Sequence, residues 1–170
     1  DYFKYGYLLR FNFDVTLDIN NDNSFEYYPK SHEDRFKMTW FDAELYGMHT
    51  PLQSQSDLMI KLETPYKIVS NKSTKVLLTD PFYNYDLSYR IVPGIVDPLY
   101  VNDVNIIIEP LTEKIEIKRG DPALVMFSLD NLNIQSRVAT KKDNKIIRRN
   151  LYKQNTYGLS WYEKHRSNRD

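Results

Sequence analysis

The sequence predicts an all-β protein built from antiparallel strands, with a short helical extension at its C-terminus. Apolar and polar residues alternate along residues 5–19, and short alternating segments recur at even spacing, separated by turn residues, as far as residue 139. Helical spacing of apolar residues is confined to residues 143–165. Evenly spaced short strands are typical of a sandwich, a jelly roll or a barrel.

The N-terminal part predicts a β-hairpin. Residues 5–19 form either one long half-buried strand or two strands in line, because alternation with a period of two places their apolar side chains on one face. The polar residues 20–23 form a turn, residues 24–28 return as a strand, and alternation resumes at residues 36–40. Residues 42–56 show no clear period and include Gly47 and Pro51, so we expect a loop there.

The remaining elements follow from the same patterns. Turns are expected at residues 64–65, 71–74 and 109–113, and a loop at residues 80–86. Helices are expected near 143–156 and after Leu159, interrupted by Gly158. Residues 1–140 are therefore expected to form a β domain, and residues 141–170 a basic, partly helical extension. The expected strands are 57–63, 66–70, 75–79, 87–92, 103–109, 113–118, 123–129 and 133–139.

Composition limits the possible functions. The chain has 170 residues, of which 41% are hydrophobic and 14% aromatic, and this is enough to bury a core. The formal net charge is zero, so no overall field attracts nucleic acid or a membrane surface. Cysteine is absent, which excludes disulfide and thiol chemistry. No apolar run approaches the roughly 20 residues of a membrane-spanning helix, and no membrane partner is expected.

A central stretch, residues 86–127, resembles a known enzyme architecture. Gly94, Ile95, Val96, Asp97 and Tyr100 form a Gly-Ile-Val-Asp-x-x-Tyr motif, which is followed by an expected strand pair and a Gly-Asp turn at residues 120–121. This order resembles the trimeric dUTPase and dCTP deaminase superfamily, and also phage proteins of unknown function that share the pattern. The resemblance implies a dUTPase-like sandwich or jelly roll with its core at about residues 57–129 and an N-terminal strand addition. It also implies a homotrimer.

The same resemblance implies roles for the motif residues. In the enzymes the motif aspartate contacts the sugar hydroxyl and orients the catalytic water, and the tyrosine stacks on the deoxyribose. Gly94, Ile95, Asp97 and Tyr100 are thus the candidates for a nucleotide pocket. A structural alternative exists, because an aspartate before a proline, as in Asp97-Pro98, is a common turn residue.

Several departures from the family pattern concern phosphate binding. Asn102 stands where the family has a glycine, and Val125 stands at or near the position of a glutamine. The Pro-Arg-Ser segment and the glycine-rich C-terminal arm of the family have no counterpart. Hydrolysis between phosphates needs cationic ligands and a positioned water. The sequence therefore favours a non-catalytic protein with a vestigial pocket and no cofactor, and Mg²⁺ is expected only if the alternative of a divergent nucleotide-binding or hydrolysing enzyme holds.

The C-terminal extension is basic and contains aromatic residues. It could form an arm that docks on an acidic neighbouring subunit, a solvated helix face, or a surface that binds nucleic acid. The three histidines, His32, His49 and His165, lie far apart and do not predict a metal site. The candidate assembly or nucleic-acid contacts are Lys141, Lys142, Lys145, Arg148, Arg149 and Trp161.

These observations lead to one functional expectation. We expect a non-catalytic structural or assembly protein, a component of a virion or an accessory protein of a virus or phage, located in the virion or the host cytoplasm. Its expected partners are further copies of the chain and other virion proteins. A long strand with an available edge and an ordered arm are both suited to linking neighbouring chains.

Overall fold

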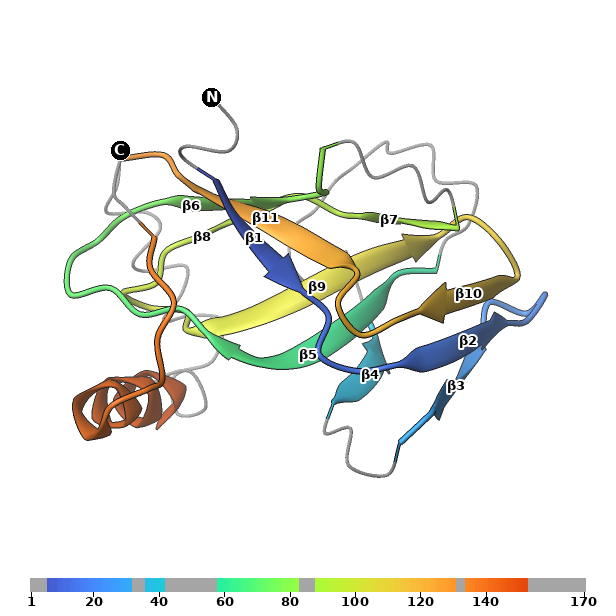
Figure 1. Ribbon diagram of the computed structural model, residues 1–170, viewed down its shortest axis with the longest axis horizontal. Coiled ribbons are helices and arrows are strands. Elements are labelled where there is room, and N and C mark those ends of the chain that lie inside the picture. Colours follow the sequence, from blue (N-terminus) through green and yellow to red (C-terminus); the bar gives the residue numbers. More distant parts are fainter. Residues whose placement is uncertain (1–5, 32–35, 42–57, 83–87, 131–133, 153–170) are drawn as a thin grey trace.

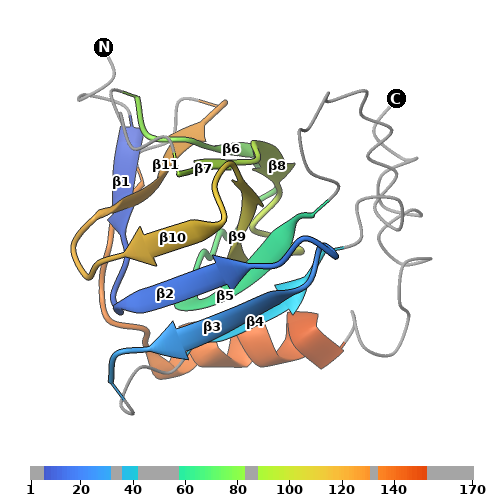
Figure 2. The same cartoon turned by 90° about the vertical axis from the view of Figure 1, so that its right-hand side faces the viewer.

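The computed structural model describes residues 6–31, 36–41, 58–82, 88–130 and 134–152, and these form three antiparallel sheets and one helix (Figures 1 and 2). The described part of the helix covers residues 141–152 and lies at one end of the longest axis of the molecule (Figure 1). The expectation of a mostly β protein with a C-terminal helix is confirmed. The expected loop at 42–56 and the second helix after Leu159 lie outside the described residues.

The three sheets are assembled from strands that are distant in sequence. The first has the order β1 (Gly6–Arg10), β11 (Pro122–Ser128), β6 (Val76–Thr79) and β8 (Gly94–Val96). The second has the order β10 (Lys114–Ile117), β2 (Val15–Ile19) and β3 (Phe25–Pro29). The third has the order β4 (Lys37–Trp40), β5 (Ile60–Lys67), β9 (Asp103–Pro110) and β7 (Tyr89–Ile91).

Side chains from all three sheets meet in one apolar core. Along β2, β10 and residues 103–108 of β9 the buried residues alternate with more exposed ones, which is the pattern that the sequence displays. Partly buried aromatic residues extend the core towards β3 and β4. The fully enclosed members include Phe13, Val15, Leu17, Leu58, Ile60, Leu62, Ile106, Ile108, Ile115, Ile117 and Leu124.

The long N-terminal alternating segment is two strands, β1 and β2, in different sheets. The chain leaves the first sheet at Phe11, whose backbone N–H donates to the Asp121 carbonyl (3.0 Å) and whose carbonyl accepts from the N–H of Gly120 (2.8 Å). Gly120 has a φ of +94°, a left-handed conformation that favours glycine. The expected Gly-Asp turn is thus present, and it holds the transition between two sheets.

The expected turn at residues 64–65 is wrong, because β5 runs through it without interruption. Its partner β4 pairs only as far as Glu63, so Pro65 lies where no β4 residue needs its missing N–H. The register between β5 and β9 shifts between Glu63 and Lys67, and the Thr64 hydroxyl donates to the Val104 carbonyl (2.5 Å). Pro65 therefore lies within β5, at the irregularity in the pairing of β5 with β9.

The expected strand at 133–139 is also wrong. Residues 134–140 are irregular and largely exposed, and Val138 is 91% exposed. Only Ile134 of this segment packs against the core. The apolar residues here share no common buried face, so their spacing does not produce a strand.

Candidate functional site

The motif at residues 94–100 forms a short edge strand, β8, followed by a turn around Asp97. Asp97 is 6% exposed, and its carboxylate accepts hydrogen bonds from the Ser73 hydroxyl (2.6 Å) and the Leu99 N–H (3.0 Å). Its backbone carbonyl accepts from the N–H groups of Tyr100 (3.0 Å) and Val101 (2.9 Å). This is the arrangement of an aspartate that builds a turn. The Asp97 side chain links the motif to the loop that precedes β6.

Asn102 joins the loop that follows β8 (residues 97–102, named here the motif loop) to the C-terminal helix. It is buried, and its amide nitrogen donates to the carbonyls of Pro98 (2.8 Å) and Ile68 (2.9 Å). Its carbonyl oxygen accepts from the side-chain amide of Asn150 (2.8 Å), which also donates to the Leu99 carbonyl (2.9 Å). Asn150 is equally buried. The pair of asparagines therefore docks the helix on the motif loop.

The remaining motif residues differ in their exposure and surroundings. Ile95 is 55% exposed on β8, and Tyr100 is half-buried at the end of the turn. Gly94 has an ordinary φ, and a Cβ built on it would meet no atom within 4 Å, so the fold does not require a glycine there. Val125 is buried within β11, where an apolar side chain is suitable. The structure thus explains Val125 by packing.

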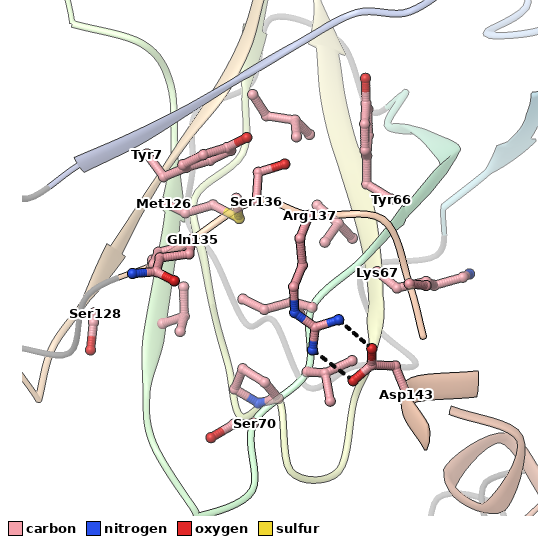
Figure 3. Close-up of a pocket in the computed structure, with 18 of the residues that line it drawn as sticks. Tyr7, Tyr66, Lys67, Ser70, Met126, Ser128, Gln135, Ser136, Arg137 and Asp143 are labelled. Atoms are coloured by element: carbon pink, nitrogen blue, oxygen red, sulfur yellow. Dashed lines mark hydrogen bonds and ion pairs between the residues drawn. The ribbon is translucent and has the colours of Figure 1, made fainter. Parts of the chain in front are cut away.

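A cavity of about 380 Å³ lies next to the motif loop, under the segment 134–139 (Figure 3). Its lining is mixed, with apolar side chains such as Leu9, Val76 and Met126 and with polar groups at Tyr7 and Gln135. Pro98 of the motif loop also contributes to the wall, but Asp97 does not. This volume lies within the range of ligand pockets.

Arg137 and Asp143 form an ion pair at this cavity, as Figure 3 shows. The guanidinium donates to both carboxylate oxygens, at 2.5 and 2.9 Å. Asp143 also accepts from the backbone N–H (2.8 Å) and the hydroxyl (2.6 Å) of Thr140, which caps the helix. The hydrogen bonds from Arg137, and then those from Thr140, hold the pKa of the Asp143 carboxyl well below its ordinary value. The pair fixes the segment 134–139 to the start of the helix.

A second arginine is paired across two strands. Arg90 on β7 lies opposite Glu109 on β9, and the guanidinium contacts both carboxylate oxygens, with Arg90 Nη2 at 3.1 Å from Glu109 Oε1. Glu109 is 1% exposed, whereas Arg90 is exposed. Arg90 and Arg137 are thus both engaged with internal carboxylates.

The basic residues of the helix lie together on its exposed side. Lys141, Lys142, Lys145, Arg148 and Arg149 are all exposed, whereas Asp143 and Asn150 are buried on the side that faces the sheets. Trp161, the remaining candidate contact, lies outside the described residues.

An exposed aromatic area on β3 is not predicted by the sequence. Tyr27 and Tyr28 are exposed, and the Tyr27 ring lies 5.9 Å from that of Phe36, which precedes β4. Trp40, at the end of β4, is 59% exposed. A run of aromatic residues in a predicted strand ordinarily indicates burial, so the sequence alone does not distinguish this area from the core. Its only signal is the lack of clear alternation in residues 25–29.

Two other classes of site are absent from the part of the chain that the structure describes. It contains no group of three or more His, Cys, Asp or Glu side chains that could hold a metal ion. Nor does any helix within it have the length and apolar character needed to span a membrane.

Comparison of the chain with protein-family models, with curated proteins and with solved structures finds no match.

Proposed function

We propose that this chain is a non-catalytic structural protein that assembles with further copies of itself, or with other proteins, through open strand edges. The observation that carries the proposal is the edge of β3. Among the described residues β3 pairs only with β2, and it presents Tyr27 and Tyr28 to solvent. An exposed strand edge flanked by aromatic side chains is a template for adding a strand from another chain.

The hydrogen-bonding pattern identifies the groups on this edge. Asn20 N–H donates to the Ser24 carbonyl (2.9 Å) and Lys30 N–H to the Asp14 carbonyl (3.1 Å), at the two ends of the β2–β3 ladder. Bonded and non-bonded pairs alternate in an antiparallel ladder. The backbone N–H groups of Phe25 and Tyr27 therefore point away from β2, and Pro29 has no N–H. Two donors and the neighbouring carbonyls remain for a partner strand.

The internal use of the motif residues supports the non-catalytic part of the proposal. The Asp97 carboxylate is turned towards Ser73 and the Leu99 backbone, and Asn102 binds Asn150. A catalytic aspartate would need to face a substrate and a water within hydrogen-bond reach. The motif loop instead supports the helix.

The proposal extends to the arrangement of the three sheets, to the number of chains in the assembly and to the biological setting of the protein. We propose that the three sheets form a dUTPase-like sandwich or jelly roll, that the assembly is a homotrimer, and that the protein acts in a virion or as a viral or phage accessory protein. The motif at 94–100 and the Gly-Asp turn at 120–121 support the architecture. The remaining two points follow from the resemblance to the superfamily and to phage proteins.

The assembly proposal is tested by measuring the molar mass of the full chain by sedimentation equilibrium from about 1 to 200 µM. We expect concentration-dependent oligomers. We also expect Tyr27→Thr/Trp40→Thr, which keeps strand-forming residues, to weaken them. The matched control is Leu129→Thr/Val138→Thr, which removes two other exposed apolar side chains. A wild-type chain that stays monomeric throughout would contradict the proposal, and an equal effect of the control pair would remove β3 and β4 as the contact.

A second candidate function, nucleotide binding, is favoured by one observation. The cavity of about 380 Å³ is lined by Pro98 of the motif loop and by Thr74, whose N–H lies 3.4 Å from the Asp97 carboxylate. Deoxynucleoside triphosphates with Mg²⁺ would then raise the melting temperature of the chain. The stabilisation would be lost in Met126→Trp, which fills the cavity, and reduced in Asp97→Asn, which alters the hydrogen bond that positions Thr74 in the cavity wall. No shift at millimolar nucleotide would exclude this candidate.

A further inference from the structure

The helix 141–152 separates its basic side chains from its buried ones. At 100° per residue, the basic residues and Tyr152 fall within an arc of about 120° on the exposed side. Asp143 and Asn150 lie on the opposite side, together with the half-buried Ile146 and Ile147. We name the exposed side the basic face, and it consists of Lys141, Lys142, Lys145, Arg148, Arg149 and Tyr152.

The basic face contains no compensating acid. Asp143 is the one acidic residue of the helix, and it is bound by Arg137 on the other side. Lys141, Lys145 and Arg149 follow one another at a spacing of four residues, so their like charges repel along the face. An arrangement that disfavours the isolated helix is suited to binding a surface of opposite charge.

The part of the outer face of the β10–β2–β3 sheet that lies towards the β2–β3 turn has such a charge. The register aligns Lys114, Asp18 and Glu26 in one row across the three strands, and Glu116, Thr16 and Tyr28 in the next. These residues alternate with the buried Val15, Leu17, Ile115 and Ile117, so they lie on the solvent side of the sheet. Two further acids, Asp22 and Glu113, lie in the turns at one end of this sheet. We name as the acidic face Asp18, Asp22, Glu26, Glu113 and Glu116, with Lys114 the one basic residue in these two rows.

The two faces match in size and are far apart within one chain. The twelve described residues of the helix extend over about 18 Å, and the five residues of β2 span about 17 Å. Figure 1 shows the helix and the β10–β2–β3 sheet at opposite ends of the longest axis. The basic face of a chain therefore does not meet its own acidic face.

We propose that the basic face of one copy docks on the acidic face of the next copy. The contact joins two different surfaces, so repetition closes a ring when the rotation permits and otherwise continues as an open array. This inference rests on the proposed function only because it requires a second copy of the chain. A contact made by exposed charges weakens as salt shortens the screening length from about 10 Å at 0.1 M to about 3 Å at 1 M.

Charge reversal on each face tests the contact. Full-length wild-type chain is compared with Lys145→Glu/Arg149→Glu, with Glu26→Lys/Glu116→Lys and with the fourfold variant that combines them, by sedimentation equilibrium in 50 mM NaCl. We expect each double variant to raise the dissociation constant at least tenfold. We expect the fourfold variant to restore association, because the complementary charges are exchanged. Wild-type association should also weaken at least tenfold in 1 M NaCl.

Two controls establish that a loss of association comes from these two faces. Lys72→Glu/Lys75→Glu makes the same change of charge as the helix variant, at two exposed residues outside both faces, and should leave association unchanged. Circular dichroism and the melting temperature of each variant establish that it is folded. Failure of the fourfold variant to restore association, while both double variants remain folded, would overturn the contact.

Other outcomes distinguish this inference from the proposed function. Oligomers that persist unchanged in both double variants would overturn the inference and leave the assembly proposal intact. A monomeric wild-type chain would overturn both. If the helix variant loses binding to a 30-nucleotide DNA strand while its self-association is unchanged, the basic face serves nucleic acid and the inference is wrong.

Discussion

Replacement of Asn150 by alanine should detach the C-terminal helix from the motif loop. The Asn150 amide donates two hydrogen bonds, to the Leu99 carbonyl and to the Asn102 side chain, in a buried position. Each buried hydrogen bond of this kind contributes about 1 kcal/mol, so the loss is about 2 kcal/mol. Alanine is the better helix former by about 0.6 kcal/mol. The expected net destabilisation is therefore about 1.4 kcal/mol.

A matched substitution in the same helix separates the contribution of the two hydrogen bonds from the change in helix propensity. Asn144 is exposed, so Asn144→Ala gains the same helix propensity without losing a buried side-chain hydrogen bond. Urea unfolding of the two variants should differ by about 2 kcal/mol. Amide hydrogen exchange of residues 144–152 should accelerate in Asn150→Ala and slow slightly in Asn144→Ala. Equal unfolding free energies, with unchanged exchange in the helix, would refute the docking role of Asn150.

Three further predictions concern the ion pairs and the Gly-Asp turn. Arg90→Ala should lower the unfolding free energy by about 2 kcal/mol, between the values for exposed and buried pairs, because it leaves Glu109 buried without its partner. The Arg137 and Thr140 hydrogen bonds lower the pKa of Asp143, so their stabilisation is complete above the unfolded value of about 4 and is lost as the pH falls through the folded value. The difference in urea midpoint between wild type and Asp143→Asn should therefore shrink as the pH is lowered from 6 to 3. Gly120→Ala should cost about 1–2 kcal/mol of unfolding free energy through its φ of +94° alone, since its Cβ meets no atom within 4 Å.

Each of these has a result that would contradict it. Glu109→Gln/Arg90→Gln removes the charge pair while retaining polar side chains, and it should be less destabilising than Arg90→Ala; the opposite order would show that the buried carboxylate is not the cause. A midpoint difference at Asp143 that stays constant down to pH 3 would show that its ionisation is not linked to folding. Gly94→Ala is the control for Gly120→Ala, because Gly94 has an ordinary φ and equally open space; equal losses in the two variants would show that the left-handed φ is not the cause.

The sheet elements could be predicted from the sequence where one face of a strand is buried. In β2, in β10 and in residues 103–108 of β9 the period of two in the side chains translates directly into alternating burial. Pro65 led to the wrong prediction of a turn because a proline ordinarily interrupts a paired strand. The sequence of β5 does not show that β4 is too short to pair with the position of Pro65. Val138 misled because an apolar side chain in an alternating segment can still face solvent.

The candidate site was predictable only in its local part. The order Asp97-Pro98 predicts a turn, and the Thr140-x-x-Asp143 spacing carries the signal of a helix N-terminus, because both interactions are made within a few residues. The bonds that give these residues their roles come from distant segments. Ser73 reaches Asp97 over 24 positions, and Asn150 reaches Asn102 over 48. No sequence pattern fixes such pairings before the fold is known.

Asn102 is the residue through which the motif loop binds the C-terminal helix. A glycine at this position could neither donate to Ile68 and Pro98 nor accept from Asn150 through a side chain. The asparagine therefore makes the loop after Asp97 a bonded support. That support holds the helix whose outer side is basic. Asn102 consequently also positions the basic face that we propose joins neighbouring copies.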